Sequence, residues 1–353
     1  MIRVLVVDDS PTVRYYLCEM VREHPRLELA GSAVDGLEAV ARVAELRPHV
    51  VLMDIEMPHL DGIEATRRIM AETPVPIVIC SAVLDRDLVA KSYQAVAAGA
   101  LMAVVKPAGI GSPGARRTVD ELLHKLELMA AVKVVRRKPT MVSPQPRGMV
   151  TSLSGERLKL LQALWRRPPG LVAIGASAGG PQVLQMILAR LRQDFQLPIL
   201  IVQHIAAGFL EGLIDWLRSE CSLDLRIARE GETPRPASVY FAPDDHHLEI
   251  APDFTLKILD SAPEYGVRPA VAPLFRSLAR LDGNPALVVL LTGMGRDGAR
   301  EMLDLHRAGF PTLAQDAASC LVDGMPGEAE RLGAVDERLP PEKIAEILNL
   351  IVS

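Results

Sequence analysis

The sequence predicts an α/β protein with two doubly wound parallel-sheet domains joined by a linker. Its 353 residues are too many for one ordinary domain, so two domains are the natural expectation. Short apolar runs alternate with amphipathic stretches up to about residue 125 and again from residue 169 onward. Between these parts, a basic cluster and repeated prolines interrupt the alternation. We therefore expect domains at 1–125 and 169–353, with a linker at 126–168.

The first domain begins with an apolar run and alternates from there. The runs that predict strands are Arg3–Val7, Leu27–Ala30, His49–Met53, Ile77–Cys80 and Leu101–Val105. The segments with helical spacing are Val13–Glu23, Leu37–Leu46 and Thr118–Val135. Because strands alternate with helices, we expect a parallel sheet.

The second domain resumes the same alternation after the linker. Its strand-like runs are Leu171–Ile174, Ile199–Val202, Ser238–Ala242 and Leu287–Leu291. Its helix-like segments are Gln182–Leu191, Phe209–Glu220 and Pro273–Arg280. Within the linker, Leu158–Trp165 is a candidate short helix. The basic cluster Lys133–Lys138 favours a solvated segment over a docking site for an acidic partner.

Composition narrows the class of protein. Hydrophobic residues make up 49% and charged residues 24%, which is typical of globular domains. The net charge of −5 argues against a nucleic-acid binder. Four scattered cysteines without a CxxC pair favour free thiols in a reducing compartment over disulfides or zinc. With no signal-peptide pattern and no apolar run of membrane length, we expect a cytoplasmic protein without membrane insertion.

Polar residues directly follow the apolar runs of the first domain. They are Asp8, Asp9, Asp54, Ser81 and Lys106. The carboxyl ends of parallel strands share one edge of the sheet, so these side chains are expected to meet there. Three carboxylates together favour Mg²⁺, which accepts a few carboxylates plus phosphate oxygens. Asp54 could then attack a phosphoryl donor, while Lys106 and Ser81 hold the phosphoryl oxygens.

Three segments of this domain resemble the receiver domain of response regulators, over roughly residues 1–120. They are Val6–Ser10, Met53–Pro58 and Lys106–Pro107. The resemblance implies a flavodoxin-like fold, Asp54 as phosphoacceptor, Mg²⁺ bound by Asp8, Asp9 and Asp54, and a histidine kinase as donor. Receivers usually carry an aromatic switch residue three positions before the lysine, where this chain has Ala103.

A glycine-rich turn opens the second domain. The apolar run from Leu171 ends in Gly175-Ala-Ser177-Ala-Gly179-Gly180, and Pro181 suits the first turn of a helix. This places Ser177 at a strand-to-helix turn, where backbone N–H groups could hold an oxyanion. Such turns are common in α/β folds, so the turn alone leaves a purely structural role open.

A serine nucleophile needs a base and an orienting carboxylate. His204 ends the apolar run Pro198–His204, at the carboxyl end of a predicted strand. This is a better position for a catalytic base than those of His246, His247 and His306. Asp297 lies in the glycine-rich segment that follows Leu287–Leu291. Its position also fits a helix N-cap, so both roles stay open.

Together these segments resemble the chemotaxis protein-glutamate methylesterases, over about 170–350. Further matching segments are Tyr240–Pro243, Arg268–Pro269, Gln315–Asp316 and Gly324–Pro326. The resemblance implies a Rossmann-like catalytic domain with the triad Ser177, His204 and Asp297, and Met294 at the site wall or oxyanion hole. Two positions depart from the family: Ala178 replaces a frequent threonine and Ala272 a frequent aspartate.

The resemblance also implies an activity. The enzyme would hydrolyse glutamate methyl esters on methyl-accepting chemoreceptors, releasing methanol, and would deamidate receptor glutamines. Phosphorylation of Asp54 would regulate it, and we hypothesise that the unphosphorylated receiver covers the Ser177 edge. The esterase reaction needs no cofactor, and we expect a monomer. A DNA-binding output domain is disfavoured by the strand-rich second domain, and a non-catalytic protein-binding output remains the alternative.

Overall fold

The computed structural model describes residues 1–81, 86–107, 115–132, 134, 168–281 and 286–351. The chain divides into two compact units, Met1–Pro146 and Arg147–Ser353, which are described separately. The candidate helix Leu158–Trp165 and most of the basic cluster lie outside the described residues. Among the described residues, no helix combines the length and apolar character that crossing a bilayer requires.

The first unit contains a five-stranded parallel sheet in the order β2-β1-β3-β4-β5. Its elements are β1 (Ile2–Val7), α1 (Pro11–Glu23), β2 (Leu27–Ala33), α2 (Gly36–Leu46), β3 (Val50–Met53), α3 (Gly62–Glu72), β4 (Ile77–Ser81), α4 (Arg86–Ala98), β5 (Met102–Val105) and α5 (Ala115–Ala130). Helix α1 packs against α5. Helix α3 packs between α2 and α4 and contacts both. The strand order reverses at β1, and such a reversal opens a crevice at the carboxyl ends of the strands.

Local capping explains where three of these helices begin. Asp35 and Asp61 each accept a hydrogen bond from the backbone N–H three residues on, at 2.8 Å in both cases. Ser10 caps α1 in the same way at 3.4 Å, and Pro11 follows as the first helical residue. The short polar residues before each helix therefore fix the loops at the carboxyl edge of the sheet.

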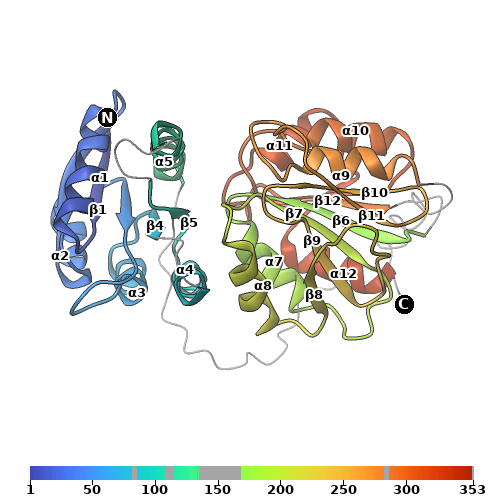
Figure 1. The fold of residues 1–353 in the computed structure, drawn as a ribbon, viewed down its shortest axis with the longest axis horizontal. Helices are drawn as coiled ribbons and strands as arrows, with labels where there is room; N and C mark the ends of the chain where they lie inside the picture. Colours follow the sequence, from blue (N-terminus) through green and yellow to red (C-terminus); the bar gives the residue numbers. More distant parts are fainter. Residues whose placement is uncertain (82–85, 108–114, 133, 135–167, 282–285, 352–353) are drawn as a thin grey trace. The chain divides into compact units, whose positions relative to one another are not determined.

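The second unit contains a seven-stranded parallel sheet in the order β14-β13-β12-β6-β7-β9-β8. Its strands are β6 (Leu171–Ala176), β7 (Ile199–Gln203), β8 (Asp224–Ile227), β9 (Ser238–Phe241), β12 (Ala286–Leu290), β13 (Thr312–Gln315) and β14 (Glu337–Leu339). Its helices are α7 (Gly180–Leu188), α8 (Leu210–Arg218), α9 (Val271–Leu278), α10 (Ala299–Arg307), α11 (Met325–Arg331) and α12 (Pro341–Ile351). Helices α9, α10 and α11 cover one face of the sheet, and α7, α8 and α12 cover the other (Figure 1).

Both predicted parallel sheets are confirmed, with additions. The antiparallel hairpin β10 (His247–Ile250) and β11 (Leu256–Leu259) packs against α9 and was not expected from the sequence. The expected helix Thr118–Val135 ends earlier, at Ala130. Its end tightens because the N–H groups of Ala131 and Val132 bond to carbonyls three residues back.

The apolar residues of the strands and the facing helices fill the cores. In the second unit, β6, β7 and β12 are buried along their whole length. Strands buried on both faces carry no polar alternation, which is why their sequences read as continuous apolar runs. The order reverses at β6, which lies between β7 and β12. The carboxyl ends of these three strands therefore frame the second crevice.

Candidate active site and acidic pocket

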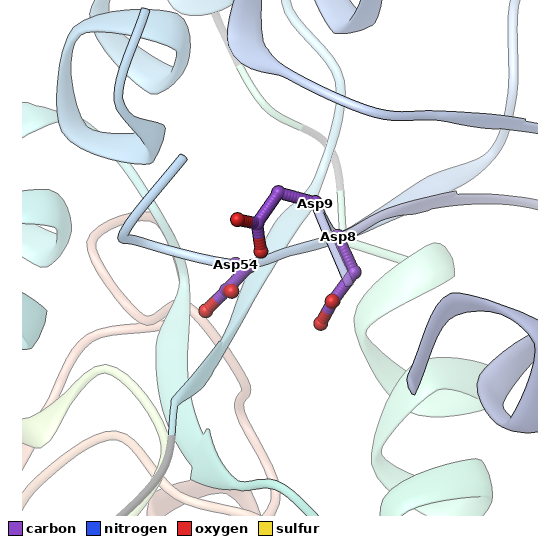
Figure 2. Close-up of side chains that lie close together, drawn as sticks. All are labelled: Asp8, Asp9 and Asp54. Atoms are coloured by element: carbon purple, nitrogen blue, oxygen red, sulfur yellow. The ribbon is translucent and has the colours of Figure 1, made fainter. Parts of the chain in front are cut away.

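The acidic pocket of the first unit lies at the ends of β1 and β3. Asp8 and Asp9 follow β1, and Asp54 follows β3, held by a 2.9 Å bond from its N–H to Val7 O. Ligand atoms of the three carboxylates all lie within 4.8 Å of one another (Figure 2). Asp8 and Asp54 are buried, whereas Asp9 is exposed. The sequence prediction that these residues meet is thus realised in the fold.

Lys106 stands over this pocket. Its Nζ lies 2.7 Å from Asp54 Oδ2 and 2.9 Å from Asp8 Oδ2. Burial raises the pKa of the Asp54 carboxyl, although the hydrogen bond from Lys106 opposes the rise. Burial would lower the pKa of Lys106, but its hydrogen bonds to Asp54 and Asp8 outweigh burial and raise it. The lysine is therefore held as a cation.

The remaining oxygens test whether a hard cation fits. Asp8 Oδ1 accepts from Ser10 N–H at 3.0 Å, and Asp54 Oδ1 accepts from Ile55 N–H at 2.8 Å. Asp8 Oδ2 is buried, and Lys106 is its polar contact among the described residues. Lys106 contacts two of the three carboxylates, and Arg14 Nη1 bonds to the backbone carbonyls of Asp8 and Asp9, so the carboxylates outnumber these two cations. An oxygen-preferring divalent cation fits this set of ligands.

Ser81 and Ala103 complete the edge of this sheet. Ser81 ends β4 and is buried, and its carbonyl accepts the Lys106 N–H at 2.9 Å. Ala103 lies in β5 opposite Ile79 and packs against the core. A small side chain therefore occupies the position where receivers usually carry an aromatic ring.

In the second unit, Ser177 directly follows β6. Its N–H donates to Thr292 O at 3.0 Å, and its carbonyl accepts from Gly180 N–H at 2.8 Å. Gly293 packs against the serine so closely that a Cβ there would lie 2.6 Å from Ser177 Cβ and 2.4 Å from Met325 Sδ. Only glycine fits at this contact, which explains the glycine after Thr292.

His204 reaches the same edge from β7. The pairing of Ala176 with Gln203 brings His204 beside Ser177, and His204 N–H donates to Ala176 O at 2.9 Å. The ring Nε2 of His204 lies 2.8 Å from Asp297 Oδ2. This leaves ring Nδ1 as the atom that can take a proton from the serine. Among the described residues, the Ser177 hydroxyl has no hydrogen bond yet, as is frequent in ligand-free active sites.

Asp297 accepts hydrogen bonds from the first residues of α9, although the helix that follows it in the sequence is α10. Its Oδ2 accepts from Val271 N–H at 2.6 Å, and its Oδ1 accepts from Ala272 N–H at 3.0 Å. Helix α10, which follows Asp297, has Gly298 as its N-cap residue and no side-chain cap. The two roles left open by the sequence therefore coexist, because Asp297 caps α9 and also bonds to His204.

Gln203 is a residue that the sequence reasoning missed. Its side-chain amide donates to Ser177 O at 2.8 Å and to His204 O at 2.9 Å. It leaves no room at Gly180, where a Cβ would lie 2.0 Å from Gln203 Oε1. A polar amide at the end of the apolar run Ile199–Gln203 was the available signal, because a buried amide requires partners.

Ala178 and Met294 lie on either side of Ser177. The Ala178 carbonyl accepts from Thr292 Oγ1 at 3.0 Å, and Met294 lies between Gly293 and Gly295. Among the described residues, no acceptor is recorded for the backbone N–H of Ala178 or Met294. Both donors are therefore available to an oxyanion.

The other histidines lie elsewhere. His246 Nδ1 is 2.8 Å from Asp244 O. His247 is fully buried at the start of β10, rather than in a loop. His306 is half-buried, and its Nδ1 lies 3.1 Å from Thr312 Oγ1 and 3.4 Å from Asp336 Oδ1. His204 is thus the histidine that the fold brings to Ser177.

Comparison with known proteins agrees with this geometry. The family model for CheB methylesterase matches residues 172–348, and the model for the response regulator receiver domain matches residues 4–111. A Geobacter metallireducens protein named protein-glutamate methylesterase/protein-glutamine glutaminase 4 is 45% identical over 352 residues, covering 99% of this chain and 98% of its own. A Nitrosospira multiformis protein named protein-glutamate methylesterase/protein-glutamine glutaminase is 44% identical, covering 100% of this chain and 98% of its own.

A solved structure gives the same result for the second unit. The crystal structure of the Thermotoga maritima CheB methylesterase catalytic domain is 36% identical, with a TM-score of 0.50, and covers 52% of this chain and 99% of that one. Since full-length relatives and both family models agree, the chain belongs to the CheB methylesterase family, with an amino-terminal response regulator receiver domain.

Proposed function

We propose that this protein is a phosphorylation-regulated serine esterase of chemotaxis adaptation. Its substrates would be glutamate γ-methyl esters on methyl-accepting chemoreceptors, and its products free glutamate and methanol. The observation that carries the proposal is the convergence of Ser177, His204 and Asp297 at the carboxyl edge of one sheet, with Asp297 bonded to His204. A chemotaxis histidine kinase would supply the phosphoryl group to Asp54.

The first chemical step is attack by the serine. His204 Nδ1 takes the proton from Ser177 Oγ while Oγ bonds to the ester carbonyl carbon. The carbonyl oxygen becomes an oxyanion, which the N–H groups of Ala178 and Met294 can bind. This role uses backbone N–H of residue 178, so alanine in place of the family's frequent threonine keeps the donor.

The second half of the reaction releases both products. The bond from the carbonyl carbon to the methoxy oxygen breaks, and His204 returns its proton to that oxygen to give methanol. Water then attacks the acyl carbon while His204 takes one water proton, the bond from that carbon to Ser177 Oγ breaks, and His204 returns the proton to Oγ. Asp297 keeps the imidazole oriented and stabilises its cation through both half-reactions. A glutamine side chain would react through the same steps and release ammonia.

The receiver provides the regulatory input. A carboxylate oxygen of Asp54 would attack the donor phosphorus as the bond from phosphorus to the kinase histidine nitrogen breaks, with Lys106 and Ser81 near the transferred oxygens. Asp8, Asp9 and Asp54 would hold Mg²⁺, which neutralises charge on the phosphoryl group when bound. The cluster of three carboxylates, which outnumber the cations beside them, supports this assignment.

Domain limits and cell location follow the same proposal. We assign the receiver to 1–125, the linker to 126–168 and the catalytic domain to 169–353. Four cysteines without disulfides support a reducing compartment, and hence the cytoplasm. The monomeric state stays a prediction, which sedimentation of the full chain would check.

Methanol release from a methylated receptor tests the proposed function. The full chain would be assayed with Mg²⁺ and an acyl-phosphate donor, alongside Ser177→Ala and the control Ser219→Ala. Ser219 is an exposed residue directly after α8, away from the carboxyl edge of the sheet. We expect Ser177→Ala to lose about 10³-fold or more and the control to keep its rate. Equal release by Ser177→Ala and wild type would exclude Ser177 as the nucleophile, whereas no release by wild type would support a protein-binding output.

A further inference from the structure

One buried histidine outside the proposed triad has both ring nitrogens engaged. His247, the first residue of β10, is 0% exposed. Its Nδ1 accepts a hydrogen bond from Ala270 N–H at 3.0 Å, and its Nε2 lies 3.1 Å from Ala262 O. The ring thereby joins the two ends of the segment that leads from β11 into α9.

These contacts fix the tautomer of the ring. A backbone N–H can only donate, so Nδ1 of His247 carries no hydrogen, and Nε2–H donates to Ala262 O. Rotating the ring by half a turn would place the Cδ2–H against the Ala270 N–H, and adding a second proton would place an N–H there. His247 is therefore held in one orientation with one arrangement of hydrogens.

The bond from Ala270 matters because of the two amides that follow it. Ala270 is the N-cap residue of α9 and provides no side-chain cap, and the N–H groups at a helix start have no partner within the helix. The Ala270 N–H bonds to His247, whereas the N–H groups of Val271 and Ala272 bond to Asp297. Three consecutive amides thus connect His247 to the carboxylate that meets His204.

We propose that His247 is a positioning residue for catalysis, which sets the start of α9 and through it the orientation of Asp297 toward His204. This inference rests on the proposed esterase function. Asp297 Oδ2 is shared between Val271 N–H, at 2.6 Å, and His204 Nε2, at 2.8 Å. A displaced helix start would therefore draw the carboxylate away from the imidazole. Small displacements of catalytic groups cost large factors in rate.

A second contact between the same elements supplies a matched control. The N–H of Ile250, at the other end of β10, donates to Ser277 Oγ at 3.0 Å. Ser277 is fully buried near the C-terminal end of α9, at the opposite end of the helix from its N-terminus. Ser277→Ala leaves a buried N–H unpaired and so lowers stability without touching the helix start.

Two amide substitutions separate the roles of the ring nitrogens. In His247→Asn, the side-chain oxygen can replace Nδ1 as acceptor for Ala270. In His247→Gln, the side-chain NH₂ can replace Nε2 as donor to Ala262, but the acceptor for Ala270 is lost. We expect kcat for methanol release by the phosphorylated full chain to fall about tenfold or more in His247→Gln, with KM within about twofold. In His247→Asn and Ser277→Ala, kcat should stay within about threefold of wild type.

A spectroscopic measurement makes the test independent of turnover. In full-length protein with ¹⁵N-labelled histidine, the proton between His204 Nε2 and Asp297 should give a downfield resonance. We expect this resonance to persist in His247→Asn and Ser277→Ala and to be lost in His247→Gln. If wild type released no methanol while this pattern held, the proposed function would fail and the positioning role would stand.

Three results would overturn the proposal. The first is an unchanged kcat and resonance in His247→Gln. The second is an equal loss of both in His247→Asn, provided that variant folds, which its thermal midpoint shows. The third is a loss of kcat in Ser277→Ala as large as in His247→Gln, since stability alone would then explain the effect.

Discussion

Asp297 bonds to His204 across a separation of 93 residues in the chain, and it does so through the ring Nε2 at 2.8 Å. In the proposed mechanism, this pairing leaves ring Nδ1 to accept the Ser177 proton. The same carboxylate caps α9 through Val271 and Ala272. A single side chain therefore joins the proposed catalytic base to the helix that packs on β10.

Asp297→Asn should lower both activity and stability. The amide has one oxygen in place of two, so its NH₂ faces either the Ala272 N–H or, after a flip, both the Val271 N–H and His204 Nε2. We expect kcat to fall about 10²- to 10⁴-fold, and the free energy of unfolding of the second unit to fall by about 1–2 kcal/mol. Methanol release and chemical denaturation measure the two effects. A stable variant with wild-type kcat would exclude the proposed role.

Gln203→Leu tests the amide that bridges the serine and the histidine. The substitution removes the donor to Ser177 O and His204 O and leaves the half-buried His204 carbonyl without that partner. We expect a loss of about 1–3 kcal/mol in stability and a lower kcat, measured as above. If kcat stayed at the wild-type value, the Gln203 hydrogen bonds would contribute to stability but not to catalysis.

Glu301 gives a stability prediction that depends on pH. Burial raises the pKa of its carboxyl, the charges of Asp297 and Glu264 add to the rise, and Arg276 opposes it. A raised pKa means that the folded state binds the proton more tightly than the unfolded chain. The charged carboxylate therefore costs stability above the raised folded pKa, and this cost disappears below the ordinary value of about 4.3.

Glu301→Gln should accordingly raise the thermal midpoint of the second unit at pH 7, and the advantage should shrink as the pH falls toward 4. Calorimetry over this range, with the exposed Glu220→Gln as control, measures the difference. An advantage that grew on acidification would contradict the assigned direction.

Magnesium should bind the acidic pocket of the first unit. Adding Mg²⁺ is expected to raise the thermal midpoint of that unit, since a ligand of the native state stabilises it by mass action. Asp9→Asn should raise the dissociation constant about tenfold or more, because ligand charge sets the affinity. Glu72→Gln, exposed at the end of α3, is the control. Equal Mg²⁺ affinity in Asp9→Asn would remove Asp9 from the site.

Cys320 should resist alkylation. Burial, reinforced by the charge of Asp323, raises the pKa of its thiol to about 12. The reactive thiolate at pH 8 is then scarce, and we expect labelling by iodoacetamide on the order of 10³-fold slower than for free cysteine. Mass spectrometry of the peptide over time measures this rate. Rapid labelling of the native protein would contradict the buried, protonated thiol.

The sequence contained enough to place the main site residues. Asp8, Asp54, Ser177 and His204 each follow an apolar run, and parallel pairing carries the ends of such runs to one edge. These side chains meet even if the predicted register of the paired strands is wrong by one residue. The same local rule identified the glycine-rich turn beside Ser177.

Features that depend on packing between distant elements were not predictable in this way. Nothing local tells that Asp297 caps α9 instead of α10, or that His247 bonds to Ala270. The hairpin of β10 and β11 has four residues in each strand, too few for a clear pattern of alternation. Gln203 carried a signal, but its partners became apparent only when β6 and β7 were paired.

The covalent intermediate tests the central claim most directly. The full chain, phosphorylated and turning over a methylated receptor, would be quenched with acid, and the peptide that contains Ser177 would be weighed by mass spectrometry. The account predicts a receptor glutamyl group esterified to Ser177, absent from Ser177→Ala. Methanol release at the wild-type rate by Ser177→Ala, or a glutamyl group on another residue, would contradict it.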